Sequence, residues 1–92
     1  MISDDDESAE VLIIDDQQFN LFAMKGQLSH LGAACDTAIS GEKAMEVLEQ
    51  RLEALTIDKT FPFYKLILLD YSMPGMSGPE TARKMKRLFD EF

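Results

Sequence analysis

The chain reads Val11-Leu12-Ile13-Ile14-Asp15-Asp16 near its beginning and Leu66-Ile67-Leu68-Leu69-Asp70 in its second half. Both stretches are short, continuous apolar runs that stop at an aspartate. An uninterrupted apolar run of this length is typical of a strand that is buried on both faces, as strands in parallel sheets usually are. The two runs therefore predict two strands of a parallel sheet, each followed directly by acidic residues.

The segment after the first run has the spacing of an amphipathic helix. Its leucines and a methionine recur at intervals of three and four residues, which predicts a helix over about 18–31. Phe19 and Phe22 lie beside the apolar face of this predicted helix. Gly32 follows it and suits the residue that ends a helix.

The rest of the chain alternates in the same way. A weaker strand of small residues is predicted over 33–38, and Ser40 is placed to cap a second helix. A polar and aromatic loop is predicted over 56–63, and Pro79 suits the first turn of a third helix. The order β-α-β-α-β-α predicts an α/β fold, in which a parallel sheet has right-handed crossovers and helices on both faces.

Acidic residues gather at one edge of this predicted sheet. Asp15, Asp16 and Asp70 all follow the carboxyl ends of strands, where open α/β sheets place their functional groups. If the two apolar strands are neighbours, the three carboxylates meet and repel one another, and a hard cation such as Mg²⁺ would relieve that repulsion. The plainer alternative is that these aspartates only cap a helix and begin a turn.

Composition narrows the possible partners. The 92 residues carry 9 Lys and Arg against 17 Asp and Glu, a formal net charge of −8, which opposes binding of this segment to nucleic acid or to anionic membranes. No apolar run is long enough to span a membrane. Cys35 is the only cysteine, so no intrachain disulfide forms, and we expect a reducing, cytoplasmic location. Residues 1–10 are acidic and are expected to form a disordered tail ahead of a domain over 11–92.

Longer motifs carry a family resemblance. The stretch from Leu66 to Gly78, which contains Asp70-Tyr71-Ser72-Met73-Pro74-Gly75-Met76-Ser77-Gly78, resembles the receiver domain of two-component response regulators. The stretch Asp15-Asp16-Gln17-Gln18-Phe19-Asn20 looks like receivers carried on hybrid histidine kinases. The resemblance implies a flavodoxin-like, doubly wound sheet, here truncated to three βα units with strand order 2-1-3.

The resemblance also implies roles for individual residues. Asp70 would accept a phosphoryl group from the phosphohistidine of a histidine kinase or phosphotransfer protein. Asp16 would bind Mg²⁺ directly, Asp15 largely through water, and Ser72 would offer its backbone carbonyl to the metal. The module would thus serve two-component signal transduction as a phosphoacceptor, and whether it catalyses its own phosphorylation stays open.

Two alternatives stay open because the resemblance covers only three of the family's five βα units. The Ser or Thr that ends the family's fourth strand, and the Lys that ends its fifth, have no counterpart here. The chain could therefore be a degenerate receiver that acts as a binding scaffold without phosphorylation. A phosphohydrolase of another α/β family ranks lower, because Ser72 stands where such enzymes usually carry a second aspartate. Finally, the third strand would lie exposed at the sheet edge. This predicts instability, self-association through that strand, or dependence on a companion segment that supplies the fourth and fifth strands.

Overall fold

A computed structural model describes residues 9–91 and shows a three-stranded parallel sheet with three helices. The elements run in the order β1 (Val11–Ile14), α1 (Gln18–His30), β2 (Cys35–Ala38), α2 (Gly41–Ile57), β3 (Leu66–Leu69) and α3 (Gly78–Glu91). The strands lie in the order β2-β1-β3, as predicted. Both pairings are parallel, so β1 is the inner strand and β3 is an edge strand.

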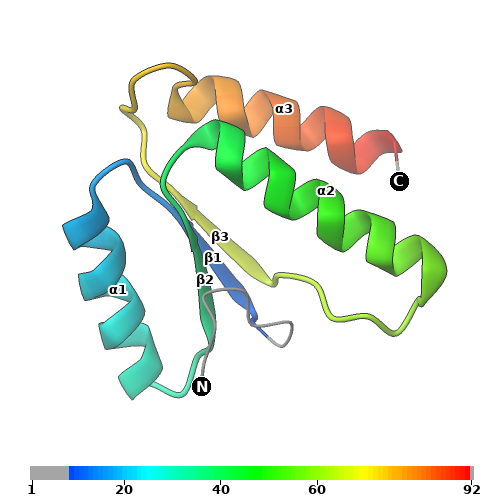
Figure 1. Cartoon of the computed structure of the whole chain (residues 1–92), viewed down its shortest axis with the longest axis horizontal. Helices are drawn as coiled ribbons and strands as arrows, with labels where there is room; N and C mark the ends of the chain where they lie inside the picture. Colours follow the sequence, from blue (N-terminus) through cyan, green and yellow to red (C-terminus); the bar gives the residue numbers. More distant parts are fainter. Residues whose placement is uncertain (1–8, 92) are drawn as a thin grey trace.

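Helices cover both faces of the sheet. Figure 1 shows α1 on one face, with α2 and α3 side by side on the other. The alternation of side chains along β1 explains this arrangement, since Leu12 and Ile14 pack toward α2 and α3 whereas Val11 and Ile13 pack toward α1. The central strand is therefore apolar on both sides, as its uninterrupted sequence predicted.

The larger of the two hydrophobic clusters lies between the sheet and the pair α2 and α3. It combines residues of β1 and β2 with Ala44 and Leu48 of α2 and with Met85 and Leu88 of α3. The smaller cluster, on the α1 face, is centred on Leu21 and Cys35. This confirms the expectation that the sheet is doubly wound, because apolar side chains on both of its faces pack against helices.

The helix ends follow local signals in the sequence. Gly32 has φ of 84°, a left-handed conformation that glycine adopts freely, and its N–H donates to Ser29 at the end of α1. The Ser40 hydroxyl accepts from the Lys43 N–H at 3.0 Å, so the predicted cap of α2 is present. At α3 the Ser77 hydroxyl accepts from the Glu80 N–H at 3.3 Å, a cap that the sequence analysis did not identify.

Two bounds differ from the sequence predictions, and the exposure of two phenylalanines was not predicted. Helix α2 continues through Ile57 rather than stopping before the predicted loop, and Thr56 bonds its hydroxyl to the Glu53 carbonyl inside the helix. Strand β2 begins at Cys35 rather than residue 33, because the Ala33 N–H still bonds to the Leu28 carbonyl at the end of α1. Phe19 and Phe22 are exposed, at 79% and 81% of their surface, since they point away from the face of α1 that meets the sheet.

A buried polar cluster at the amino end of the sheet was not predicted. Asp36 of β2 accepts hydrogen bonds from the Arg51 guanidinium, at 2.9 Å, and from the Tyr64 hydroxyl. Arg51 also lies 4.4 Å from the centroid of the Tyr64 ring and donates to the Pro62 carbonyl at 3.2 Å. All three side chains are more than nine-tenths buried. The cluster therefore joins β2, α2 and the connection that leads into β3.

Ala9 and Glu10, the last residues of the acidic segment over 1–10, pack at the amino end of the sheet. Residues 1–8 lie outside the described part of the chain, whereas Ala9 is fully buried and the Glu10 carbonyl accepts from the Lys65 N–H at 2.7 Å. The Lys65 ammonium lies 3.5 Å from the Glu10 carboxylate. Lys65 is thus held at the edge opposite Asp70, as its position in the sequence predicted. Among residues 9–91, no helix has the length and apolarity needed to cross a bilayer.

Candidate functional site

Three carboxylates meet at the carboxyl ends of β1 and β3. Asp15, Asp16 and Asp70 each offer an oxygen, and these oxygens lie within 4.8 Å of one another. The backbone explains the convergence, because β1 and β3 pair with Ile14 opposite Leu69, and the Asp70 N–H donates to the Ile14 carbonyl at 2.9 Å. The residue that follows each strand is therefore an aspartate, and Asp15 and Asp70 lie side by side at the same edge of the sheet. This confirms that the sequence-predicted acids lie together.

Asp15 is the most firmly held of the three. Its Oδ1 accepts the Gln17 N–H at 2.9 Å, and its Oδ2 accepts the Asn20 amide at 3.3 Å. The side chain is about 9% exposed, so both oxygens are fixed in direction before any ligand arrives. Asp16 and Asp70 are half-buried and face solvent more freely. The site therefore combines one anchored carboxylate with two that a ligand can reach.

The loop after Asp70 folds back tightly on itself. The Gly78 N–H donates to the Tyr71 carbonyl at 3.0 Å, and a Cβ on Gly78 would lie 2.3 Å from the Asp70 carbonyl oxygen. No real side-chain carbon approaches an oxygen that closely, so only glycine lets α3 begin directly beside the end of β3. Met73 is buried and anchors the middle of the loop, whereas Ser72 is exposed. The loop geometry keeps Asp70 at the mouth of the site.

The donor set fits a small divalent cation. Mg²⁺ binds oxygens at about 2.1 Å in an octahedron, so its opposite ligands lie about 4.2 Å apart. The three carboxylate oxygens lie within 4.8 Å of one another, which is close to the width of one such coordination shell. Small side-chain movements, or a water between the ion and one carboxylate, would complete the fit. The spacing therefore suits a single ion rather than a pair of metals.

Sequence reasoning missed two residues that shape the site. Gln17, just before α1, and Asn20, in its first turn, hold Asp15, and the pattern of apolar residues gives no sign of either contact. The available signal was the position of Asn20, one helical turn after the acidic pair. Glu42 of α2 also reaches the loop, with its Oε2 3.2 Å from where a Cβ on Gly75 would lie. Lys65 is far from the three carboxylates, as described above, and contributes no cation there.

Comparison with known proteins identifies one family. A family model described as the response regulator receiver domain matches residues 11–91. The virulence sensor protein BvgS of Bordetella pertussis is 32% identical over 79 residues, covering 86% of this chain and 6% of BvgS. The peroxide stress-activated histidine kinase mak3 of Schizosaccharomyces pombe is 28% identical over 80 residues, covering 87% of this chain and 3% of mak3. The chain thus spans only a small part of the length of these relatives.

Solved structures show the same fold. The response regulator receiver domain protein from Methanospirillum hungatei JF-1 has a TM-score of 0.69 at 30% identity, covering 89% of this chain and 56% of that protein. The receiver domain of the histidine kinase CKI1 from Arabidopsis thaliana, complexed with Mg²⁺, has a TM-score of 0.83 at 24% identity. That comparison covers 95% of this chain and 64% of the CKI1 domain. The chain thus covers only part of the length of either neighbour.

Proposed function

The chain belongs to the response regulator receiver domain family, and on that premise we propose that it is a phosphoacceptor module in two-component signalling. Asp70 is the acceptor, and Asp15, Asp16 and Asp70, with the backbone carbonyl of Ser72, hold Mg²⁺. A histidine kinase or phosphotransfer protein of the cytoplasm supplies the phosphoryl group. The convergence of three carboxylates within 4.8 Å carries this proposal.

The chemistry follows from the position of Asp70. One of its carboxylate oxygens attacks the phosphorus of a phosphohistidine, an O–P bond forms, and the N–P bond breaks with its electron pair returning to the imidazole. Asp70 is half-buried at the mouth of the site, so a donor side chain can approach it from solvent. Asp15 stays in place because hydrogen bonds from Gln17 and Asn20 orient it. Mg²⁺, when bound, would neutralise charge on the transferred group and on the crowded carboxylates.

The relatives support the same assignment. BvgS and mak3 are named as a sensor protein and a histidine kinase, and the CKI1 receiver domain was crystallised with Mg²⁺. A phosphorelay partner and a magnesium cofactor are therefore the appropriate first candidates for this chain.

Incubation with acetyl phosphate and Mg²⁺, followed by mass spectrometry of the intact protein, tests the proposal. The chain should gain one phosphoryl group, and Asp70→Asn should gain none. Asp16→Ala should lose both Mg²⁺ binding and phosphorylation, while Asp15→Ala should weaken Mg²⁺ binding. Glu49→Gln is a matched control, because it removes an exposed carboxylate of α2 far from the site. A folded chain that binds no Mg²⁺ and gains no phosphoryl group would instead be a binding scaffold.

A further inference from the structure

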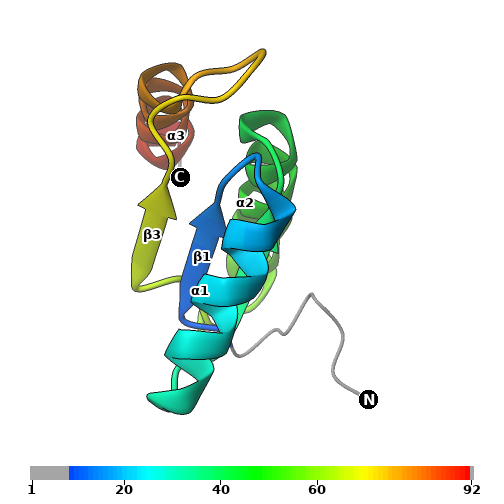
Figure 2. The same ribbon diagram turned by 90° about the vertical axis from the view of Figure 1, so that its left-hand side faces the viewer.

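The beginning of α2 lies against the loop that follows Asp70. This loop, here called the site loop, covers residues 71–77 and leads into α3. Figure 2 shows it extending from the end of β3 toward the beginning of α2. A Cβ on Gly41, the first residue of α2, would lie 2.2 Å from Thr81 Oγ1 and 3.0 Å from Met76 Sδ. The beginning of α2 therefore approaches both the site loop and α3 at a residue that has no side chain.

The contact at Gly41 leaves no room for a small adjustment. Thr81 is fully buried, and its hydroxyl donates to the Ser77 carbonyl at 2.7 Å, so the oxygen that faces Gly41 is held in place. The Thr81 N–H donates to the same carbonyl at 2.9 Å. A side-chain carbon at Gly41 would therefore have to break the bond of the hydroxyl or push the first turn of α3 away from α2. Either change would disturb Ser77, the last residue of the site loop.

Ser77 connects this contact to Asp70 over a few residues. Its hydroxyl accepts the Glu80 N–H at 3.3 Å and so caps α3. The next residue is Gly78, whose N–H donates to the Tyr71 carbonyl at 3.0 Å and which has no space for a Cβ beside the Asp70 carbonyl. The two ends of the site loop are therefore held together, and a displacement at Ser77 moves the residues next to Asp70.

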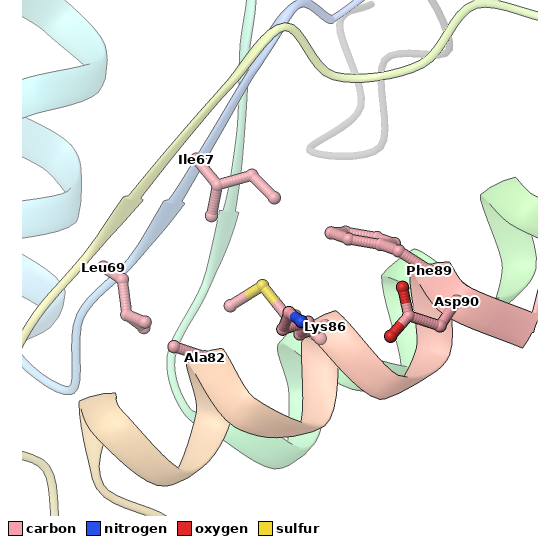
Figure 3. A pocket seen from close by; sticks show the side chains of 7 residues that line it. Ile67, Leu69, Ala82, Lys86, Phe89 and Asp90 are labelled. Carbon is pink, nitrogen blue, oxygen red and sulfur yellow. The ribbon is translucent and has the colours of Figure 1, made fainter.

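The strand that precedes Asp70 also faces α3. Figure 3 shows Ile67 and Leu69 of β3 pointing toward α3, where they line one surface with Ala82. Ala82 follows Thr81, so the same turn of α3 meets the beginning of α2 through Thr81 and faces β3 through Ala82. A shift of this turn would therefore reach Asp70 from the strand as well as from the site loop.

We propose that Gly41 is a positioning residue for the phosphoacceptor site. By letting α2 approach Thr81 closely, it fixes the site loop, and with it the Asp70 carboxylate and the Ser72 carbonyl, in the arrangement that binds Mg²⁺. The inference rests on the proposed function, because it adds a residue to the same site. Octahedral coordination of Mg²⁺ at about 2.1 Å demands near-ideal ligand positions, so a displaced site loop should weaken binding even where the chain still folds.

Adding volume at Gly41 and removing it at Thr81 tests the proposal, with calorimetric titration of Mg²⁺ as the measurement. Gly41→Ala should weaken Mg²⁺ binding about tenfold, as expected when a residue behind the metal ligands is changed. Thr81→Ala removes the oxygen that the new carbon would meet, so combining it with Gly41→Ala should restore most of the affinity. Thr81→Ser is the matched control, because it keeps that oxygen and should restore none when combined with Gly41→Ala.

Urea denaturation of the same variants separates positioning from simple packing. A residue that matters only for packing would lower the stability of the chain but leave the Mg²⁺ affinity of the folded chain unchanged. The proposal is therefore wrong if folded Gly41→Ala binds Mg²⁺ as tightly as the unmodified chain, or if Thr81→Ser restores the affinity as well as Thr81→Ala. If the unmodified folded chain binds no Mg²⁺, the proposed function fails, and this inference fails with it.

Amide exchange of the unmodified chain keeps the test decisive if Gly41→Ala fails to fold. Coupling between two sites is reciprocal, so Mg²⁺ bound at the carboxylates should also restrain the beginning of α2. The Ala44 amide, which donates to the Ser40 carbonyl, should exchange more slowly when Mg²⁺ is added. The Asp58 amide, at the other end of α2, should exchange as before. An Ala44 amide whose exchange is unaffected by saturating Mg²⁺ would overturn the proposal.

Discussion

Removing one hydroxyl from the buried cluster at the amino end of the sheet should cost a measurable part of the stability. In Tyr64→Phe the ring stays beside Arg51, but Asp36 loses the hydrogen bond from the Tyr64 hydroxyl. Hydrogen bonds to charged groups contribute about 1.5–3 kcal/mol, and Asp36 keeps its bond from Arg51, so we expect a loss of about 2 kcal/mol. That is a large fraction of the roughly 5–15 kcal/mol that stabilises a small domain.

Breaking the ion pair itself should be more damaging. Arg51→Met removes the guanidinium that lies 2.9 Å from the Asp36 carboxylate, which is 2% exposed. Removing one partner of a buried ion pair costs about 3–5 kcal/mol. Because both variants act on the same carboxylate, the two losses should not be additive, and the double variant measures their coupling.

Urea denaturation followed by circular dichroism measures these differences. Tyr71→Phe is the matched control, because it removes a hydroxyl from a side chain that is 77% exposed and should change the stability by no more than about 0.5 kcal/mol. Thermal melting should show Tyr64→Phe about 10 °C below the unmodified chain. If Tyr64→Phe proves as stable as Tyr71→Phe, the hydrogen bond from the Tyr64 hydroxyl does not stabilise the fold.

The same cluster predicts how stability responds to alkaline pH. Burial, followed by the hydrogen bond and negative charge of Asp36, raises the pKa of Tyr64 well above its ordinary value of 10.0. The folded chain then holds this proton more tightly than the unfolded chain, so the contribution is complete below pH 10 and is lost as pH rises above it. Tyr64→Phe should remove this part of the alkaline loss, which urea titrations at several pH values would reveal.

Three further substitutions or reactions have definite expected outcomes. Gly78→Ala places a carbon against the Asp70 carbonyl, so it should disturb the loop and weaken Mg²⁺ binding. Calorimetric titration would detect this loss, and unchanged binding would contradict the loop geometry. Ser40→Ala removes the cap at the Lys43 N–H and should cost about 1 kcal/mol in urea denaturation, with no change in Mg²⁺ affinity. Burial raises the pKa of Cys35 and covers its thiol, so a thiol reagent at neutral pH should react only as fast as the chain opens, and rapid reaction under native conditions would refute this.

The strands and the acidic site were predictable because they depend on local sequence and one topological rule. Val11–Ile14 and Leu66–Leu69 form strands with the bounds that their apolar runs indicated. Once these runs were taken as neighbours in a parallel sheet, the aspartates after them had to share an edge. Pairing of Ile14 with Leu69 in the structure confirms that reasoning.

The buried polar cluster was not predictable in the same way. Asp36 lies in a strand of small residues, and its partners Arg51 and Tyr64 come from a helix and a connection far along the chain. The spacing of apolar residues indicates which face of a helix or strand is buried. It does not indicate which polar side chains from distant segments will form hydrogen bonds there. The exposed Phe19 and Phe22 show the converse limit, because their apolar character gave no indication that they turn away from the sheet.

The strand order β2-β1-β3 also bears on how the chain folds. β1 can pair with β2 once the segment that contains α1 closes, whereas its pairing with β3 must also wait for the longer segment that contains α2 to be ordered. That later pairing is also the event that gathers Asp15, Asp16 and Asp70 within 4.8 Å, so it works against the repulsion of like charges. Dissolved ions weaken such repulsion. The refolding rate should therefore increase with ionic strength, with the docking of β3 as the salt-sensitive step.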